Sequence, residues 1–168
     1  MFCLGGRALR WALCNAVVVD VFSYTCVRLY ADLNNMAGEL PPEIGALVYL
    51  TSYISWFNAQ TGPIPTSLGL IAPLETFDVE SNDMGGDLFQ PEYSGPEGLT
   101  ELVAFRASLN NFGGTIPTEI GRWTKLRNLW FADNKVSGTI PTEIGNLVDM
   151  GKWAGKTGDA HACTRFLR

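Results

Sequence analysis

Apolar and polar positions repeat along this chain in register with a recurring asparagine. Successive asparagines of the repeat lie 24, 24, 28 and 24 residues apart, and each is followed four residues later by a glycine. A repeat with a period of about 20–50 residues is typical of a solenoid, in which each repeat forms one coil and buries its apolar face against its neighbours. The five pairs are Asn34 and Gly38, Asn58 and Gly62, Asn82 and Gly86, Asn110 and Gly114, and Asn134 and Gly138.

The residues before each asparagine predict one short β-strand per coil. Positions eight, five and three before it are apolar with one exception, Ser55. Because successive side chains of a strand point to opposite faces, this alternation places one face in the core and the other in solvent. We expect burial in particular at Leu74, Phe77, Leu126 and Leu129. The full sets are Cys26, Leu50, Leu74, Leu102 and Leu126; Leu29, Tyr53, Phe77, Phe105 and Leu129; and Ala31, Ser55, Val79, Ala107 and Phe131.

The residues after each asparagine predict an extended segment and then a short helical turn. A leucine or isoleucine stands six residues after it, followed by proline in four of the five repeats. Proline fixes φ and favours extended backbone in the residue before it. Residues 118–121 and 142–145 then have the composition of a turn capped by threonine and ended by glycine. We therefore predict 3₁₀ or single-turn helices opposite the strands.

The asparagine itself is expected to tie neighbouring coils together. It stands where the strand ends and the chain turns inward, and its amide both donates and accepts hydrogen bonds. A buried polar group left unpaired costs about 1–3 kcal/mol, so a ladder of buried amides would stabilise every turn. The predicted ladder consists of Asn34, Asn58, Asn82, Asn110 and Asn134.

These positions resemble the leucine-rich repeat, L-x-x-L-x-L-x-x-N-x-L. The addition G-x-I-P-x-E-I-G, at residues 114–121 and 138–145, resembles the plant-type subclass found in receptor-like ectodomains and extracellular inhibitor proteins. The resemblance covers about three-quarters of the chain, residues 26–150. It implies an α/β solenoid, a right-handed coil of about five turns with a parallel concave sheet and short 3₁₀ or helical turns on the convex side.

Two coils depart from the pattern. In the second, Ser55 and Gln60 replace apolar residues, so local slippage of the strand is possible. In the third, four extra residues enlarge the segment 89–98, whose prolines and glycines indicate a loop. This loop is either a tolerated surface insertion or a projecting contact loop that presents Phe89 and Tyr93.

The two ends lie outside the repeat. Residues 1–25 are predicted to be a signal-like or cap segment, because Arg7 and Arg10 precede an apolar run at 11–19. Cys14 and Cys26 approximate the paired-cysteine cap of plant-type ectodomains, and either pair in an oxidising compartment or stay reduced. A sixth coil would need asparagine where Gly158 stands, so residues 151–168 are predicted to be an irregular tail. The missing cap suggests a fragment of a longer receptor-like protein or an imperfect gene model.

Charge and composition argue against several functions. A net charge of -5 disfavours nucleic acid, whose phosphates need lysine and arginine. Residues 29–105 hold eleven acidic and no basic residues, whereas 106–168 hold nine basic and five acidic ones, which indicates either a solubilising surface or a polarised binding face. No catalytic, phosphate-binding or metal motif is present, so we expect no enzyme, cofactor or metal. The chain also lacks an apolar run long enough to insert into a membrane.

The favoured function is a non-catalytic recognition module that binds a protein, peptide or glycan on the concave face. The alternative is a structural solenoid that self-associates through its uncapped C-terminal coil. The resemblance implies an extracellular or cell-surface location. Equivalent residues of successive coils form columns on the concave sheet, and aromatic residues and arginine are enriched at binding hot spots. The expected ligand contacts are Tyr30, Ile54, Trp56, Asp78, Glu80, Arg106 and Trp130.

Overall fold

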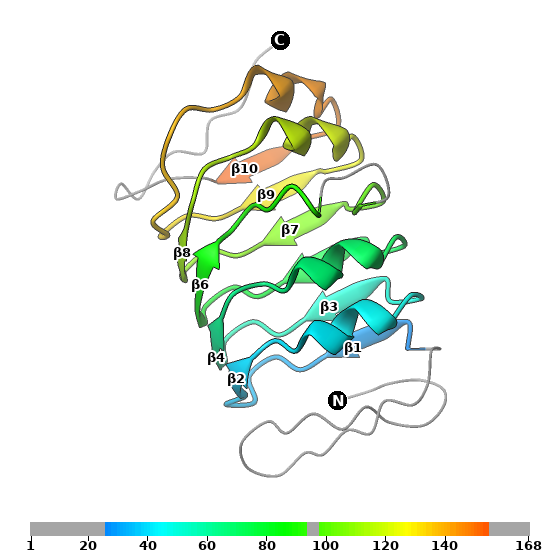
Figure 1. The fold of residues 1–168 in the computed structure, drawn as a ribbon, viewed down its shortest axis with the longest axis vertical. Helices are drawn as coiled ribbons and strands as arrows, with labels where there is room; N and C mark the ends of the chain where they lie inside the picture. The colour runs from blue at the N-terminus through cyan, green and yellow to red at the C-terminus, as the bar shows by residue number, and fades with distance from the viewer. Residues whose placement is uncertain (1–25, 94–97, 155–168) are drawn as a thin grey trace.

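The computed structural model describes residues 26–93 and 98–154 as a stack of coils (Figure 1). Each coil contributes one strand to a parallel sheet that keeps the repeat in register, so that Phe77 lies opposite Phe105 and Phe105 opposite Leu129. The predicted α/β solenoid with a parallel concave sheet is confirmed. Its strands, in spatial order, are β1 (Arg28–Tyr30), β3 (Ser52–Ile54), β5 (Thr76–Asp78), β7 (Ala104–Arg106), β9 (Asn128–Trp130) and β10 (Lys152–Ala154).

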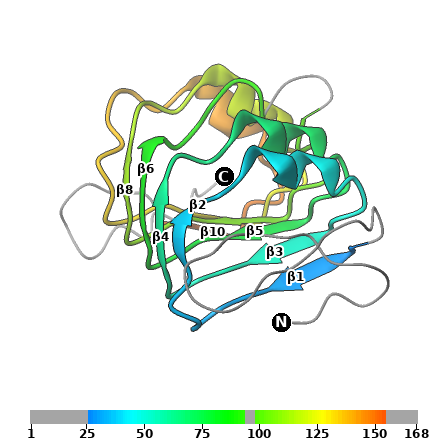
Figure 2. The ribbon, with the colours of Figure 1, turned by 60° about the horizontal axis from the view of Figure 1, so that its bottom comes forward.

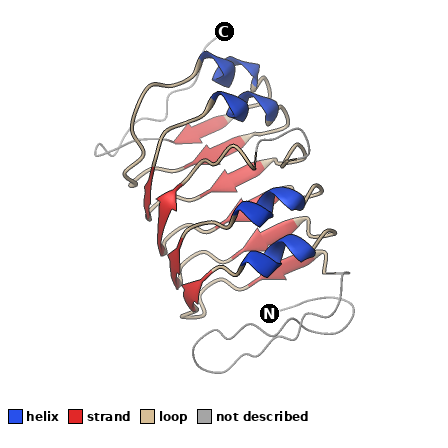
Figure 3. Cartoon of the chain, viewed as in Figure 1, coloured by secondary structure: helices blue, strands red, loops and turns tan. Residues whose placement is uncertain are grey.

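Short 3₁₀ helices lie on the side opposite this sheet (Figure 3), as predicted. The predicted threonine cap is wrong: the side chain of Thr118 bonds to Glu119, and the carbonyl of Pro117 accepts the first helical bond. Glycine does not end the turn either. Gly121 lies inside its helix, where a Cβ would meet the carbonyl oxygen of Glu143 at 2.8 Å, so this glycine permits close packing of coils. The helices are η1 (Pro42–Ala46), η2 (Thr66–Leu70), η3 (Thr118–Arg122) and η4 (Thr142–Asn146).

A second parallel sheet, which the sequence did not predict, covers a third side of the coil (Figure 2). Its four strands follow the first four ladder asparagines and consist of residues that are mostly small or polar, without apolar alternation. The repeated glycine follows from this path, because all five have positive φ, from +73° to +95°, which side chains disfavour. The strands are β2 (Ala37–Glu39), β4 (Ala59–Gly62), β6 (Asp83–Asp87) and β8 (Asn111–Gly113).

One continuous apolar core runs through the stacked coils. Leu74, Phe77, Leu126 and Leu129 are all fully buried, which confirms their predicted register. Aromatic rings stack from coil to coil, with the Phe77 centroid 5.4 Å from Tyr53 and 5.5 Å from Phe105. The core therefore fixes the alignment of the strands that carry the concave face.

The second coil keeps its register despite its polar residues, so the slippage that the sequence left possible does not occur. Ser55 and Gln60 are both fully buried and bond to each other, the Ser55 hydroxyl donating to Gln60 Oε1 at 2.6 Å. The Gln60 amide donates in turn to the Tyr53 hydroxyl at 3.0 Å. The polar groups satisfy one another, which removes most of the cost of burying them.

The third coil has no 3₁₀ helix in its described part, and its loop does not present Phe89 and Tyr93. Both side chains are buried, with Phe89 6% and Tyr93 0% exposed, so the contact-loop interpretation is wrong. The Phe89 ring packs edge to face on Phe131 at 5.3 Å and stacks on Phe105 at 5.9 Å. The Tyr93 hydroxyl donates to the Ile64 carbonyl at 2.8 Å. Inward packing gives these rings more buried apolar area than an exposed loop would.

The ends of the described region differ from the expected boundaries. Cys26 is disulfide-bonded and 1% exposed, while Cys14 and the rest of the predicted segment 1–25 lie outside the described residues. At the other end the sheet continues past Met150, because β10 pairs with the open backbone edge of β9. Across residues 26–93 and 98–154, the longest helices are far too short to span a membrane.

Candidate functional site

The concave sheet brings five of the predicted contact residues into one column. Strand pairing sets Tyr30 opposite Ile54, Ile54 opposite Asp78, Asp78 opposite Arg106, and Arg106 opposite Trp130. Paired strands lie about 4.7–4.9 Å apart, so each side chain neighbours the next. We call these five residues the first column.

A second column lies two residues further along each coil. The Leu33 amide donates to the Trp56 carbonyl at 3.1 Å, and the Phe57 amide donates to the Glu80 carbonyl at 2.8 Å. These backbone bonds continue the sheet beyond the named strands and set Asp32, Trp56 and Glu80 in adjacent coils. The three residues form the second column, which runs beside the first.

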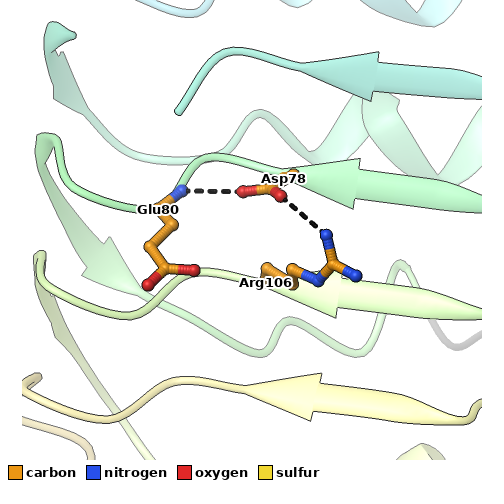
Figure 4. A network of polar contacts seen from close by, with 3 residues as sticks. All are labelled: Asp78, Glu80 and Arg106. Carbon is orange, nitrogen blue, oxygen red and sulfur yellow. Dashed lines mark hydrogen bonds and ion pairs between the residues drawn. The ribbon is translucent and has the colours of Figure 1, made fainter. Parts of the chain in front are cut away.

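An ion pair occupies the centre of the concave face (Figure 4). Arg106 Nη1 donates to Asp78 Oδ2 at 3.2 Å, and Asp78 Oδ1 accepts the backbone N–H of Glu80 at 3.2 Å. The guanidinium carbon of Arg106 lies 4.9 Å from the centroid of the Trp130 ring, within cation–π range. Asp78 is only 5% exposed. The structure therefore uses Asp78 to hold Arg106, which leaves Asp78 little surface for a ligand.

Glu80 differs from its two neighbours, because its carboxylate has no hydrogen bond or ion pair with any described residue. In Figure 4 its side chain points away from Asp78, across the adjacent coil. Partial burial raises the pKa of Glu80, the Asp78 carboxylate raises it further, and Arg106 lowers it. Glu80 thus offers a carboxylate that lacks a strong partner.

Exposed and half-buried apolar side chains surround the start of the concave face. We call Tyr30, Leu33, Ile54, Trp56 and Phe57 the apolar patch. Leu33 and Phe57 are 59% and 60% exposed, and the Phe57 ring packs edge to face on Trp56 at 6.4 Å. The predicted ligand contacts did not include Leu33 and Phe57, because both fall outside the two columns. Both stand immediately before a ladder asparagine, and their own backbone φ is positive, 57° for Leu33 and 55° for Phe57. This conformation turns their side chains outward at the edge of the sheet.

The asparagine ladder holds the columns in place. Asn82 Oδ1 accepts the Gln60 backbone N–H at 2.9 Å, and its Nδ2 donates to the Ser55 carbonyl at 3.0 Å, both in the preceding coil. Asn58, Asn110 and Asn134 make the equivalent bonds to the coil before each of them. Asn34 is exposed, and within the described residues its side-chain amide bonds only to the Asp32 carbonyl of its own coil, while its backbone N–H donates to Asn58 Oδ1.

Acidic residues are frequent near the site, yet they do not converge. Asp83 accepts a hydrogen bond from the Asn111 side chain on the second sheet, away from the concave columns. Within the described ranges, no three histidine, cysteine, aspartate or glutamate side chains are placed to hold a metal ion.

The coil geometry, the two sheets and the ladder define a leucine-rich-repeat solenoid. The leucine-rich-repeat family model matches residues 125–147. Over 99 residues the chain is 37% identical to the rice (Oryza sativa subsp. japonica) leucine-rich repeat receptor protein kinase MSP1, a match that covers 56% of this chain and 7% of the rice protein. Over this stretch the chain is therefore similar in sequence to a plant leucine-rich-repeat receptor, of whose length it spans only a small part.

Solved structures of plant receptors share the fold. The ectodomain of the Arabidopsis receptor kinase HAESA, in complex with an N-terminally extended IDA peptide hormone ligand, matches with a TM-score of 0.69 and 27% identity. A TDR receptor matches with a TM-score of 0.71 and 26% identity. The chain is covered to 76% and 75% in these comparisons, and it spans 21% of each receptor chain.

Proposed function

We propose that this chain is a non-catalytic, receptor-like recognition module that binds a peptide or a segment of a protein on its concave face. The observation that carries the proposal is the juxtaposition of the apolar patch with a charged centre on one rigid sheet. Aromatic side chains beside oriented charges are the usual anchors of a binding hot spot. The sheet is held by the core and the ladder, so a ligand would meet a preorganised surface.

The comparison with HAESA favours a peptide over a glycan, because that ectodomain shares the fold and was solved with a peptide hormone ligand. A location at the cell surface is part of the same proposal. The disulfide at Cys26 supports it, since disulfides persist in oxidising compartments.

A display selection with random dodecapeptides tests the proposal. Selected peptides are bound to the wild-type chain, to Trp56→Ala in the apolar patch, and to Tyr49→Ala in the turn between η1 and β3. Trp56 and Tyr49 are both exposed aromatic residues, 37% and 58% exposed, so the two truncations are matched and change no charge.

We expect Trp56→Ala to weaken binding at least tenfold, which corresponds to about 1.4 kcal/mol or more of binding free energy, and Tyr49→Ala to leave binding within twofold. Peptides that bind both variants equally would contradict a concave site. Chains that yield no peptide but form concentration-dependent oligomers in light scattering would favour self-association instead. Circular dichroism melts confirm that each variant is folded.

A further inference from the structure

An exposed aromatic residue lies between two acidic residues on the concave face. The second column sets Trp56 next to Asp32 of the preceding coil and next to Glu80 of the following coil. Trp56 also belongs to the apolar patch and contacts Phe57. Trp56 therefore has one acidic residue in the coil on each side of it along the solenoid axis.

Neither carboxylate is neutralised within the described part of the chain. The side chains of Asp32 and Glu80 make no ion pair there, whereas the nearby Asp78 is already paired with Arg106. Residues 29–105, which include the first three coils, contain eleven acidic and no basic residues. A low-dielectric apolar surface inside such a field concentrates the attraction for a cation.

We propose, on the basis of the function proposed above, that the occupant of this face is an extended basic peptide. Its arginine side chains lie over Asp32 and Glu80, and its apolar side chains rest on the apolar patch. Arginine suits this surface because a guanidinium bonds to carboxylates and also stacks on an aromatic ring such as Trp56. Arg106 takes no part as a free anion receptor, since Asp78 and Trp130 already engage its guanidinium.

The spacing of the two carboxylates defines the peptide further. The backbones of Asp32 and Glu80 are two coils apart, which is about 10 Å for strands spaced about 4.7–4.9 Å, and the Glu80 side chain extends further, across the coil of Arg106 (Figure 4). Side chains on the same side of an extended peptide recur every two residues, about 6.6–6.8 Å. Long, flexible arginine side chains reach across the remaining difference. Two arginines separated by one residue therefore fit the face.

The test measures fluorescence anisotropy of a labelled peptide of alternating arginine and glycine at an ionic strength of about 0.15 M, where distant charges are screened. A peptide of alternating glutamate and glycine is the negative probe. The proteins are the wild-type chain, Asp32→Asn, Glu80→Gln and the control Glu43→Gln. The control makes the same acid-to-amide change on exposed η1, and all three variants have the same net charge.

We expect saturable binding of the arginine peptide, weakened about fivefold by Asp32→Asn and by Glu80→Gln, and unchanged by Glu43→Gln. Equal losses in all three variants would show a response to net charge alone and would overturn the proposal. So would unchanged affinity in both concave variants, or a glutamate peptide that binds as well. If Trp56→Ala abolishes binding of the selected dodecapeptides while the arginine peptide fails these criteria, the concave site stands and only its basic ligand is wrong.

Discussion

The second and third coils both depart from the repeat, and they accommodate the departure in opposite ways. The second keeps its length and places the polar residues Ser55 and Gln60 inside, where they bond to each other and to Tyr53. The third gains four residues, lacks a 3₁₀ helix in its described part, and turns Phe89 and Tyr93 inward.

This difference shows what a stacked coil tolerates. The paired strands of both coils keep the same register with their neighbours. A coil therefore accepts altered chemistry inside or added length on the convex side, provided that its polar groups are paired and its core volume is filled. The alignment of the strands on the concave face depends only on this register, so neither change alters it.

The largest expected effect is the loss of the inward-turned ring of the third coil. Phe89→Ala removes contacts to Phe105, Trp123 and Phe131 and leaves a cavity. We expect a loss of about 3–5 kcal/mol in the free energy of unfolding, measured in urea. Phe57→Ala in the second coil is the control and should stay within about 0.5 kcal/mol, because Phe57 is exposed. Equal losses would refute the contrast between the two rings.

The second-largest effect concerns the hydrogen bonds by which Asn82 of the third coil holds the second coil. Asn82→Ala leaves the Gln60 backbone N–H of the second coil without its acceptor and removes one of the two donors to the Ser55 carbonyl, which keeps its bond from Asn58. We expect a loss of at least about 1–3 kcal/mol, the cost of one unsatisfied buried group, in the same urea assay. Among the described residues, Asn34→Ala removes only a side-chain bond within its own coil, and it should change stability by less than about 0.5 kcal/mol. A similar loss in both would mean that the ladder does not tie coils together.

A smaller effect is expected from the polar network of the second coil. Gln60→Leu leaves the Ser55 and Tyr53 hydroxyls without their partner, at a cost of about 1–3 kcal/mol. Adding Ser55→Ala removes one stranded hydroxyl and should recover part of that loss. Thermal and urea unfolding of both single variants and the double variant give the coupling energy. Strict additivity would show that the two side chains act independently.

The smallest effect distinguishes Glu80 of the third coil from the paired Asp78. Burial and the Asp78 carboxylate raise the pKa of Glu80, so the folded state favours its protonated form and its ionised form is slightly destabilising at neutral pH. Glu80→Gln should raise stability at pH 7 by less than about 0.5 kcal/mol. The gain should vanish as the pH falls below the ordinary glutamate range, where Glu80 is neutral in both states. A lower melting temperature for the variant at pH 7 would show that Glu80 has a stabilising partner.

The sequence predicted the coil architecture because its signal is periodic. Five asparagines in register, with apolar residues at fixed offsets such as Leu126 and Leu129, are sufficient to place every strand of the concave sheet except the last. The same register placed the columns of the concave face. It did not reveal the second sheet, whose strands consist of small and polar residues without alternation, nor β10, which pairs with an edge that the repeat pattern does not mark.

What the sequence determined by itself was therefore the register, since a period-two strand and a fixed repeat leave one way to bury the apolar set. Only the tertiary structure decided which concave residues are free. Asp78, Glu80 and Arg106 all occupy concave positions of the repeat, so their sequence positions do not distinguish them. Contact across coils pairs Asp78 with Arg106 and places Arg106 against Trp130, whereas the Glu80 carboxylate has no such partner among the described residues. The tertiary structure also turned Phe57 outward and Phe89 inward. These outcomes depend on distances between coils some 24–28 residues apart, which local patterns do not contain.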